Sequence, residues 1–293
     1  MKIIKSIKSL STCLFKLKQV NASIGFVPTM GALHEGHLHL LKQSTIDNDY
    51  TLCSIYVNPT QFNDKKDLKN YPRDSRKDIN TLKANNCDIL FMPDDSTMYA
   101  SDKIPIEYNF TDCFSKLEGA KRPGHFLGVV TIVHKLFTLI QPDKAYFGEK
   151  DYQQLWIINL FVKEYKLPIK IIPCKTIRNN IGLALSSRNI HLTEKEQKVA
   201  VNLFRALQKL KQLINSLNNE ESSPILKKNK LTRFKNNALS IILGHKLIKL
   251  DYFEIIEIEN FSFTEHIDFN KKYRALIAAY IGKIRLIDNI AIN

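Results

Sequence analysis

Cysteine is scarce in this chain of 293 residues, with only five in total. They stand at Cys13, Cys53, Cys87, Cys113 and Cys174, so no two of them have the Cys-x-x-Cys spacing of a zinc cluster or a redox-active pair. This spacing excludes both kinds of site. Unpaired thiols are typical of a reducing compartment, and we therefore expect a cytoplasmic protein.

Long hydrophobic runs are also missing. Lysines interrupt the apolar residues of the N-terminus, which therefore lacks the centre of a signal peptide, and no later stretch reaches the length of a membrane span. Hydrophobic residues make up 44% of the chain and charged residues 25%, which are the proportions of an ordinary globular protein. We expect no membrane partner.

Acidic residues are few relative to basic ones, 29 against 43, which gives a formal charge of +14. Such an excess suits a nucleic acid, an anionic membrane or an acidic small molecule. The lysines are spread through nearly every segment, however, and no patterned basic face with aromatic stacking residues is visible. We interpret the charge as a solvated surface and expect no nucleic-acid partner.

Short β-like runs alternate with helical patterns in the first half of the chain. Residues 24–28, 52–57 and 89–92 are short, apolar and closed by proline-containing turn signals, as buried parallel strands are. The alternation predicts an α/β fold, with a Rossmann-like parallel sheet and helices on both faces.

Further helices and strands extend this pattern. An apolar run that follows Gly128 and is stopped by Pro142 predicts a largely buried helix. A strand end at 145–148 and a helix over 151–165 follow. The next strand is predicted at 169–173, with a continuation to Arg178.

The residue pattern of the sequence changes after the last predicted strand of this sheet. A long Leu/Lys-rich helix, a polar linker at 218–224, another helix and strands at 252–258 and 275–281 predict a smaller C-terminal α+β domain. We place the two domains at 1–188 and 189–293.

The loop at 28–37 reads Pro-Thr-Met-Gly-Ala-Leu-His-Glu-Gly-His and joins the first strand to a helix that begins near Gly36. Such a junction presents backbone N–H groups to an anion, and phosphate is the expected ligand. His34 and His37 can both point at the phosphates, where imidazoles would donate hydrogen bonds to charge on the α-phosphate and on departing pyrophosphate.

A zinc site or two surface histidines are the alternatives for this pair. The zinc-protease pattern needs His-Glu-x-x-His, whereas His34 and His37 are only three residues apart, with Glu35 between them. The order of strand, glycine, His-x-Gly-His and helix favours a nucleotide over both alternatives.

Two later loops supply complementary charge. Both are expected outside the carboxyl ends of strands, where ligands bind in open α/β sheets. Lys150 and Arg188 would neutralise triphosphate oxygens, and the hydroxyls of the second loop would donate hydrogen bonds to the same group. Taken alone, either loop is more often an ordinary surface loop. The first loop consists of Gly148, Glu149, Lys150 and Asp151, and the second of Leu185, Ser186, Ser187 and Arg188.

Recognition of a small acid needs polar groups fixed in a mostly apolar pocket. Gln61, after Asn58-Pro-Thr, and Gln154, about one helical turn after Lys150, are placed to provide amides that both donate and accept. A single glutamine on a helix more often faces solvent.

With these loops in order, the sequence resembles the pantothenate synthetase (pantoate–β-alanine ligase) family of the adenylyltransferase superfamily, which shares the His-x-Gly-His signature. The resemblance covers almost the whole chain. The segments that carry it are 26–37, 57–62, 71–74, 122–126, 142–143, 147–151, 153–154, 182–189, 250–254 and 285–289.

The resemblance implies a two-step reaction. The pantoate carboxylate attacks the α-phosphate of Mg-ATP, pyrophosphate leaves, and the amine of β-alanine attacks the pantoyl adenylate to give pantothenate and AMP. It implies that Gln61 contacts pantoate and β-alanine, that Gln154 contacts pantoate, and that His37 is the catalytic histidine, with His34, Lys150 and Arg188 beside it in the catalytic set. The implied ATP site comprises Met30, Gly31, Ala32, Leu33, His34, Glu35, Gly36, His37, Gly148, Glu149, Lys150, Asp151, Ile177, Leu185, Ser186, Ser187 and Arg188.

Membership would also imply a homodimer and a C-terminal domain that acts as a mobile lid. A hinge at 189–193 would shelter the acyl adenylate from water. Mg²⁺ keeps several waters and needs few carboxylates, for which Asp78 and Asp151 are the candidates.

One rival is another nucleotidyltransferase of the superfamily, with a phosphorylated acceptor. Glutamines rather than basic residues at the acceptor positions speak against it. The segment 178–182 departs from the family pattern, which more usually has an acidic residue after Arg178 and an aspartate before Gly182.

Overall fold

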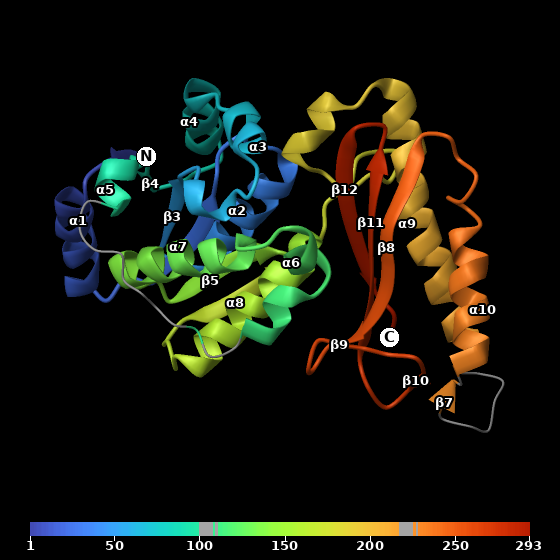
Figure 1. The fold of residues 1–293 in the computed structure, drawn as a ribbon. Helices are drawn as coiled ribbons and strands as arrows, with labels where there is room; N and C mark the ends of the chain where they lie inside the picture. The colour runs from blue at the N-terminus through green and yellow to red at the C-terminus, as the bar shows by residue number, and fades with distance from the viewer. Residues whose placement is uncertain (100–107, 109–110, 217–224, 227) are drawn as a thin grey trace. The chain divides into compact units, whose positions relative to one another are not determined.

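The computed structural model describes residues 1–99, 108, 111–216, 225–226 and 228–293, so the predicted linker at 218–224 lies outside the described residues. The contacts divide the chain into two compact units, Met1–Ile177 and Arg178–Asn293 (Figure 1). Among the helices that the structure describes, none has both the length and the hydropathy of a membrane span.

A six-stranded parallel sheet forms the centre of the first unit, in the order β1-β4-β3-β2-β5-β6. This confirms the predicted α/β class. The three strands expected first along the chain are present, as is the strand after the buried helix. The bounds are β1 Lys2–Ile4, β2 Ile24–Thr29, β3 Tyr50–Ile55, β4 Ile89–Phe91, β5 Lys144–Gly148 and β6 Lys170–Cys174.

The strand order has a switch point between β2 and β5. From β2 the chain builds outward through β3 to β4, whereas from β5 it builds the other way to β6. The loops that leave β2 and β5 therefore diverge at this point, which is where open α/β sheets bind ligands. These are two of the loops predicted to hold phosphates.

Helices flank the sheet. α2 packs on β2, β3 and β5, while α8 packs on β5 and β6 and contacts α7, which contacts α1 in turn (Figure 1). The bounds are α1 Ile7–Gln19, α2 Glu35–Asp47, α3 Lys65–Asn70, α4 Ser75–Ala84, α5 Asp95–Tyr99, α6 Leu117–Lys121, α7 His125–Ile140 and α8 Tyr152–Glu164, with short 3₁₀ helices η1 Pro59–Gln61, η2 Thr111–Ser115 and η3 Glu149–Asp151.

The buried helix expected before Pro142 is α7. Ten of its sixteen residues are buried, and the residue after its end, Gln141, has a left-handed φ of 50°. The proline that follows cannot continue a helix, which explains why the chain turns here. Two strands differ from expectation: β1, which has three residues of which only one is buried, was not predicted, and β6 ends at Cys174 instead of continuing to Arg178.

An antiparallel sheet in the order β12-β11-β8-β9 forms the second unit, which confirms the predicted C-terminal α+β composition. α9 packs on β11 and β12, and α10 packs on α9. The two predicted helices and the two predicted strands are present as α9, α10, β8 and β11, and the described residues form the additional strands β7, β9, β10 and β12. The bounds are η4 Ser187–His191, α9 Glu194–Asn215, β7 Ile225–Leu226, α10 Lys228–Leu239, β8 Ile248–Glu257, β9 Ser262–Phe263, β10 Ile267–Asp268, β11 Tyr273–Ile281 and β12 Ile284–Ala291.

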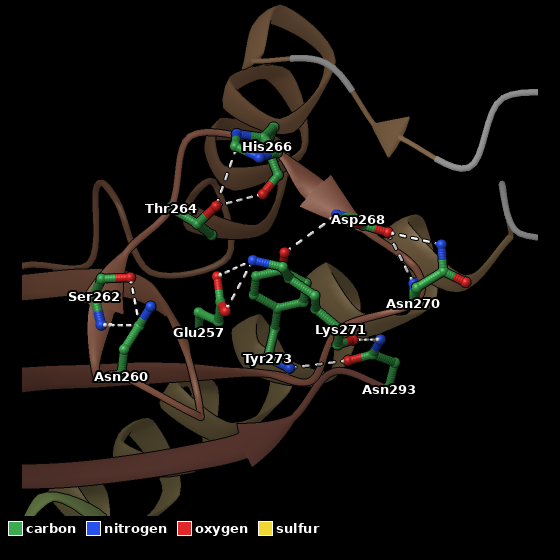
Figure 2. Close-up of polar contacts among 10 residues, drawn as sticks. All are labelled: Glu257, Asn260, Ser262, Thr264, His266, Asp268, Asn270, Lys271, Tyr273 and Asn293. Atoms are coloured by element: carbon green, nitrogen blue, oxygen red, sulfur yellow. Dashed lines mark hydrogen bonds and ion pairs between the residues drawn. The ribbon is translucent and has the colours of Figure 1, made fainter.

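Polar contacts fix the turns at one end of this sheet (Figure 2). The Lys271 ammonium lies 3.0 Å from the Glu257 carboxylate, and the Asp268 N–H donates to the Tyr273 hydroxyl at 3.2 Å. Asn293 accepts the Tyr273 N–H at 3.0 Å. These bonds tie the end of the chain to the start of β11.

Arg178 explains where the two units divide. Its guanidinium donates two hydrogen bonds to Asp288 of β12, at 2.6 and 2.8 Å, and lies 3.4 Å from the centre of the Phe204 ring on α9. A stacked, bidentate arginine holds its segment firmly. The division by contacts therefore falls before Arg178, whereas the sequence placed it after residue 188.

The segment that departs from the family pattern has its own internal support. The Asn179 side-chain oxygen accepts the N–H groups of Ile181 and Leu183, at 3.3 and 2.9 Å, and Gly182 has a left-handed φ of 96°. An amide oxygen can accept these two bonds as a carboxylate would. The asparagine is thus compatible with the same tight turn.

Candidate active site

Two consecutive residues of the loop after β2 have a left-handed backbone conformation. Gly31 has a φ of 79° and Ala32 a φ of 50°. Glycine adopts this region freely, but alanine does so only where its surroundings hold it there. A Cβ on Gly31 would lie 2.8 Å from the Asp78 carboxylate, so glycine is also needed for this close approach.

Asp78 of α4 holds that loop. One of its carboxylate oxygens accepts the Ala32 N–H at 2.9 Å and the other accepts the Leu33 N–H at 2.8 Å. The side chain is 3% exposed. From the sequence, Asp78 was expected only as a possible Mg²⁺ ligand, whereas in the structure its carboxylate faces the loop backbone.

Several other amides of the loop are also paired within the protein. The Gly31 N–H donates to the Thr29 hydroxyl, the His34 N–H to Nδ1 of His37, and the Gly36 N–H to Nδ1 of His34. The expectation of freely available backbone donors therefore needs correction at these positions. The side chains of His34 and His37 are further donors for an anion at this helix start.

The two histidines are held in one tautomer. Because each Nδ1 accepts a backbone N–H, the proton of each neutral ring lies on Nε2. The ring centres of His34 and His37 are 4.1 Å apart. The capping box that α2 forms with its own histidines thus leaves two Nε2–H donors beside one another.

Both rings are neutral at physiological pH. Burial, followed by the positive charge of Lys150, lowers the pKa of His34 to about 4. Burial and the neighbouring His34 lower the pKa of His37 to about 3. A buried imidazole resists protonation because charge is costly away from water. The pair therefore acts as hydrogen-bond donors without carrying charge of its own.

Lys150 and Asp151 belong to the same cluster. They follow β5 in η3, and the charges of both act on His34 and His37. The Lys150 ammonium lies 3.7 Å from the Asp151 carboxylate, which is 53% exposed. The structure thus brings together the loops after β2 and β5, as the sequence predicted. It adds a fixed positive charge next to two neutral donors.

Gln61 lies against the first loop. Its side chain is 8% exposed, its Nε2 lies 2.8 Å from the Met30 sulfur, and its Oε1 accepts from Asn58 at 3.2 Å. η1 packs so tightly on α7 that a Cβ on Gly128 would lie 2.4 Å from the Thr60 carbonyl oxygen. Gln61 is therefore fixed beside the predicted nucleotide loop.

Gln154 differs from its neighbour Gln153. Gln153 is buried and donates to the carbonyls of Cys113 and Lys116, so it has a structural role. Gln154 is partly buried on α8. Within the described part of the chain, no protein group forms a hydrogen bond with its amide, which is consistent with a role toward a ligand.

The third predicted loop belongs to the second unit. The Ser186 hydroxyl caps η4 by accepting the Arg188 N–H at 3.3 Å. Leu185, Ser186, Ser187 and Arg188 are all partly buried. Ile177, also predicted for the nucleotide site, is the last residue of the first unit.

Comparison with known proteins is consistent with this geometry. The pantoate-beta-alanine ligase family model matches residues 2–291. The chain belongs to this family. It is 44% identical to the pantothenate synthetase of Azobacteroides pseudotrichonymphae, with 99% of both chains covered, and 40% identical to that of Thermosipho africanus, with 100% of both covered.

Solved structures agree. Pantothenate synthetase from Thermus thermophilus superimposes with a TM-score of 0.86 at 33% identity, covering 100% of this chain and 99% of that one. The Francisella tularensis ligase, solved with beta-gamma ATP and beta-alanine, gives 0.75 at 36% identity, with 100% and 98% covered. As a member of this ligase family, the chain catalyses the ATP-dependent ligation of pantoate to β-alanine.

His125 belongs to a matched family motif, but no role was predicted for it from the sequence. Its Nδ1 lies 2.8 Å from the Gln61 carbonyl oxygen, and its Nε2 lies 3.0 Å from the Arg122 guanidinium. A carbonyl can only accept, so the proton is on Nδ1. His125 therefore supports the backbone of a predicted substrate residue. The Arg-x-x-His spacing at a helix start was the available signal.

We expect His125 to make the free ligase acid-sensitive. Burial and Arg122 lower its pKa to about 4 from an ordinary value of 6.5, so the unfolded chain takes up a proton below pH 6.5 that the folded chain refuses. Stability is therefore complete above pH 6.5 and falls between pH 6.5 and 4. Urea unfolding at pH 7 and pH 5 gives the loss in the free energy of unfolding between the two pH values. In His125→Gln this loss should be smaller than in the wild type by about 1–2 kcal/mol.

The control for this measurement is His191→Gln, at an exposed position of the second unit. It should lose as much stability between the two pH values as the wild type does. An equal loss in His125→Gln and wild type would contradict the assignment of a buried neutral imidazole to His125.

Proposed function

We propose that the ligation proceeds through a pantoyl adenylate. The pantoate carboxylate attacks the α-phosphate of ATP and releases pyrophosphate, after which the β-alanine amine attacks the acyl carbon and releases AMP. The observation that carries this proposal is the pair of neutral imidazoles beside Lys150. Neutral donors and one fixed cation suit a reaction in which negative charge moves from the α-phosphate to departing pyrophosphate.

We assign the nucleotide to the loops after β2 and β5. The Nε2–H groups of His34 and His37 would donate to phosphate oxygens, with His37 as the principal catalytic histidine. Lys150 would neutralise charge on the same group. Gly148 supports this assignment, because a Cβ there would meet no atom of the described residues within 4 Å beyond its chain neighbours, and its φ of −74° is open to any residue. The fold itself therefore does not require glycine at this position.

Pantoate is assigned to the two glutamines. Gln61 is held beside Met30, and the Gln154 amide lies on the first turns of the helix that follows Lys150. Amides can donate to a carboxylate and accept from a hydroxyl, which a hydroxy acid demands. Gln61 is also assigned to β-alanine.

Mg²⁺ fits this site through a single carboxylate. Among the described residues no group of three or more potential ligands is found, but Mg²⁺ bound to a nucleotide needs only one or two carboxylates. Asp151, whose charge acts on both histidines, would hold the ion together with phosphate oxygens. The ion would supply further neutralisation of the phosphates. Asp78 is a poorer candidate because its two oxygens are engaged.

The remaining assignments follow from family membership. Ser186, Ser187 and Arg188 are proposed as phosphate ligands that the second unit contributes, with that unit acting as a lid. We further propose a homodimer in the cytoplasm. Sedimentation of the purified protein tests the homodimer, since a monomer at micromolar concentration would contradict it.

Product analysis tests the proposed route. The purified ligase should release AMP in turnover only when pantoate and β-alanine are both supplied with ATP. With pantoate alone, rapid quenching should capture one equivalent of acyl adenylate and pyrophosphate per site. Turnover with a phosphorylated acceptor, giving a dinucleotide, would instead support a nucleotidyltransferase. ADP as the product would contradict the adenylate.

A further inference from the structure

We infer that Asp78 is a positioning residue for the adenylation step, acting through the backbone of the loop after β2. The inference rests on the proposed nucleotide role of this loop. It assigns to Asp78 a function different from metal binding. Four observations support it, and each concerns residues of the first unit.

The carboxylate occupies the place that an anion would take in this loop. Two successive N–H groups, from Ala32 and Leu33, point at its two oxygens at 2.9 and 2.8 Å. Consecutive amides that follow left-handed residues form an anion-binding concavity. The protein fills this concavity with its own side chain, so these two amides are engaged within the protein.

The loop needs an external partner to keep its shape. Ala32 is held at a φ of 50°, which L-residues adopt at a cost. Asp78 is 3% exposed and lies on α4, which follows β3 in the chain and is remote in sequence from the loop. Two charge-assisted hydrogen bonds from a rigid helix supply the restraint.

The orientation of the histidines depends on this restraint. Leu33 directly precedes His34, whose own N–H fixes the ring of His37, while the Gly36 N–H fixes the ring of His34. A change in the backbone at Leu33 therefore displaces the N–H donors that hold the two Nδ1 acceptors. The positions of both Nε2–H donors follow from the backbone that Asp78 holds.

Electrostatics indicate that this influence is geometric. Lys150 and Asp151 are the charges that act on both His34 and His37, and His34 also acts on His37; Asp78 is not among these causes. Removing Asp78 should therefore leave the charge around the rings unchanged. It should release the rings from their single tautomer.

The first test is nitrogen NMR of histidine-labelled protein without ligands. In the wild type the His34 and His37 signals should show protonated Nε2 and hydrogen-bonded Nδ1; variants at each histidine assign them. In Asp78→Ala these signals should move toward the average of two tautomers. Because no substrate is present, this result is independent of the proposed function.

The matched control is Asp74→Asn. Asp74 caps the same helix by accepting the Lys77 N–H at 3.0 Å, and among the described residues its carboxylate forms no hydrogen bond with the loop. The control should lower the melting temperature and leave the histidine signals unchanged. Unchanged signals in Asp78→Ala would overturn the inference, whatever its melting temperature.

The second test is kinetic. Asp78→Ala should lower kcat/KM for ATP by at least about tenfold, with the KM for β-alanine kept within about twofold. Sodium formate, which can enter the space left by the carboxylate, should restore part of the rate, whereas sodium chloride at equal ionic strength should not. Asp78→Asn keeps one acceptor oxygen, so its kcat/KM for ATP should lie between the values of the wild type and Asp78→Ala. It replaces the alanine variant in this test if that variant does not fold.

The two failures are distinguishable. Altered tautomers with wild-type kcat/KM for ATP would show that Asp78 shapes the loop while the proposed nucleotide role of the loop is wrong. Wild-type tautomers with a rate loss that formate does not restore would overturn the positioning role itself.

Discussion

His37→Ala is expected to lower pantoate-dependent formation of acyl adenylate by at least about a hundredfold, the usual consequence of losing one transition-state donor in a site that excludes water. The Nε2–H of His37 is neutral and held in place because its Nδ1 accepts the His34 N–H. A donor that is fixed before the reaction needs no reorganisation as charge develops. Rapid-quench measurement of pyrophosphate in the first turnover isolates this step.

The fold should survive this substitution. The variant leaves the His34 N–H without its partner, which costs about 1–3 kcal/mol, so thermal unfolding should still show a single folded state below its midpoint. His37→Gln, which places an amide donor near the position of Nε2, should retain more activity than alanine. His39→Ala, an imidazole removed from the same helix, is the matched control and should stay near the wild-type rate.

A first-turnover rate for His37→Ala within about threefold of the wild type would contradict the carried-over role. The β-alanine step offers a second comparison. If synthetic pantoyl adenylate is supplied, the variant should convert it to pantothenate much less impaired than it forms it, because the donor serves the phosphates.

The parallel sheet was predictable because most of its strands have a recognisable local sequence pattern. β2, β3 and β4 are short apolar runs closed by turn signals, and the long buried helix is stopped by Pro142. β1 was not predictable, since three residues with a single buried side chain carry no period. β12 was matched to a family motif but not seen as a strand; there Arg285 reaches Asp251 of β8 at 3.0 Å.

The candidate site likewise has features that the sequence predicts and features that it does not. The glycine and histidine pattern of the β2 loop is local, so its place at a helix start was predictable from spacing. The role of Asp78 was not, because its hydrogen bonds join residues 45 and 46 positions apart and nothing near Asp78 in the sequence marks it. The tautomers of His34 and His37 likewise depend on backbone directions that a sequence does not display.

Lys150→Ala is expected to slow adenylate formation by about a hundredfold to a thousandfold, because it removes the fixed cation of the first unit's cluster. The fold should be little affected. Its ion pair with the half-exposed Asp151 spans 3.7 Å, and a long ion pair that reaches solvent at one partner contributes little to stability. A loss of rate with an unchanged melting temperature therefore reports on catalysis.

The substitution has a second consequence for the histidines. Lys150 helps to lower the pKa of His34 and of His37, so its removal should raise both values. Burial remains the larger cause, and the rings should stay neutral at pH 7. An NMR titration of the ligand-free variant should show both midpoints displaced upward, and a downward displacement would contradict the placement of the ammonium beside the rings.

Charge and shape can then be separated. Lys150→Arg keeps the charge but replaces a compact ammonium with a planar guanidinium, so we expect it to recover part of the lost rate and most of the effect on the pKa of His34. Lys163→Ala, an exposed lysine at the other end of α8, is the matched control and should change neither quantity. If Lys150→Arg were as slow as alanine while the histidine pKa returned to its wild-type value, Lys150 would act by the geometry of its hydrogen bonds. An alanine variant near the wild-type rate would remove Lys150 from the adenylation step.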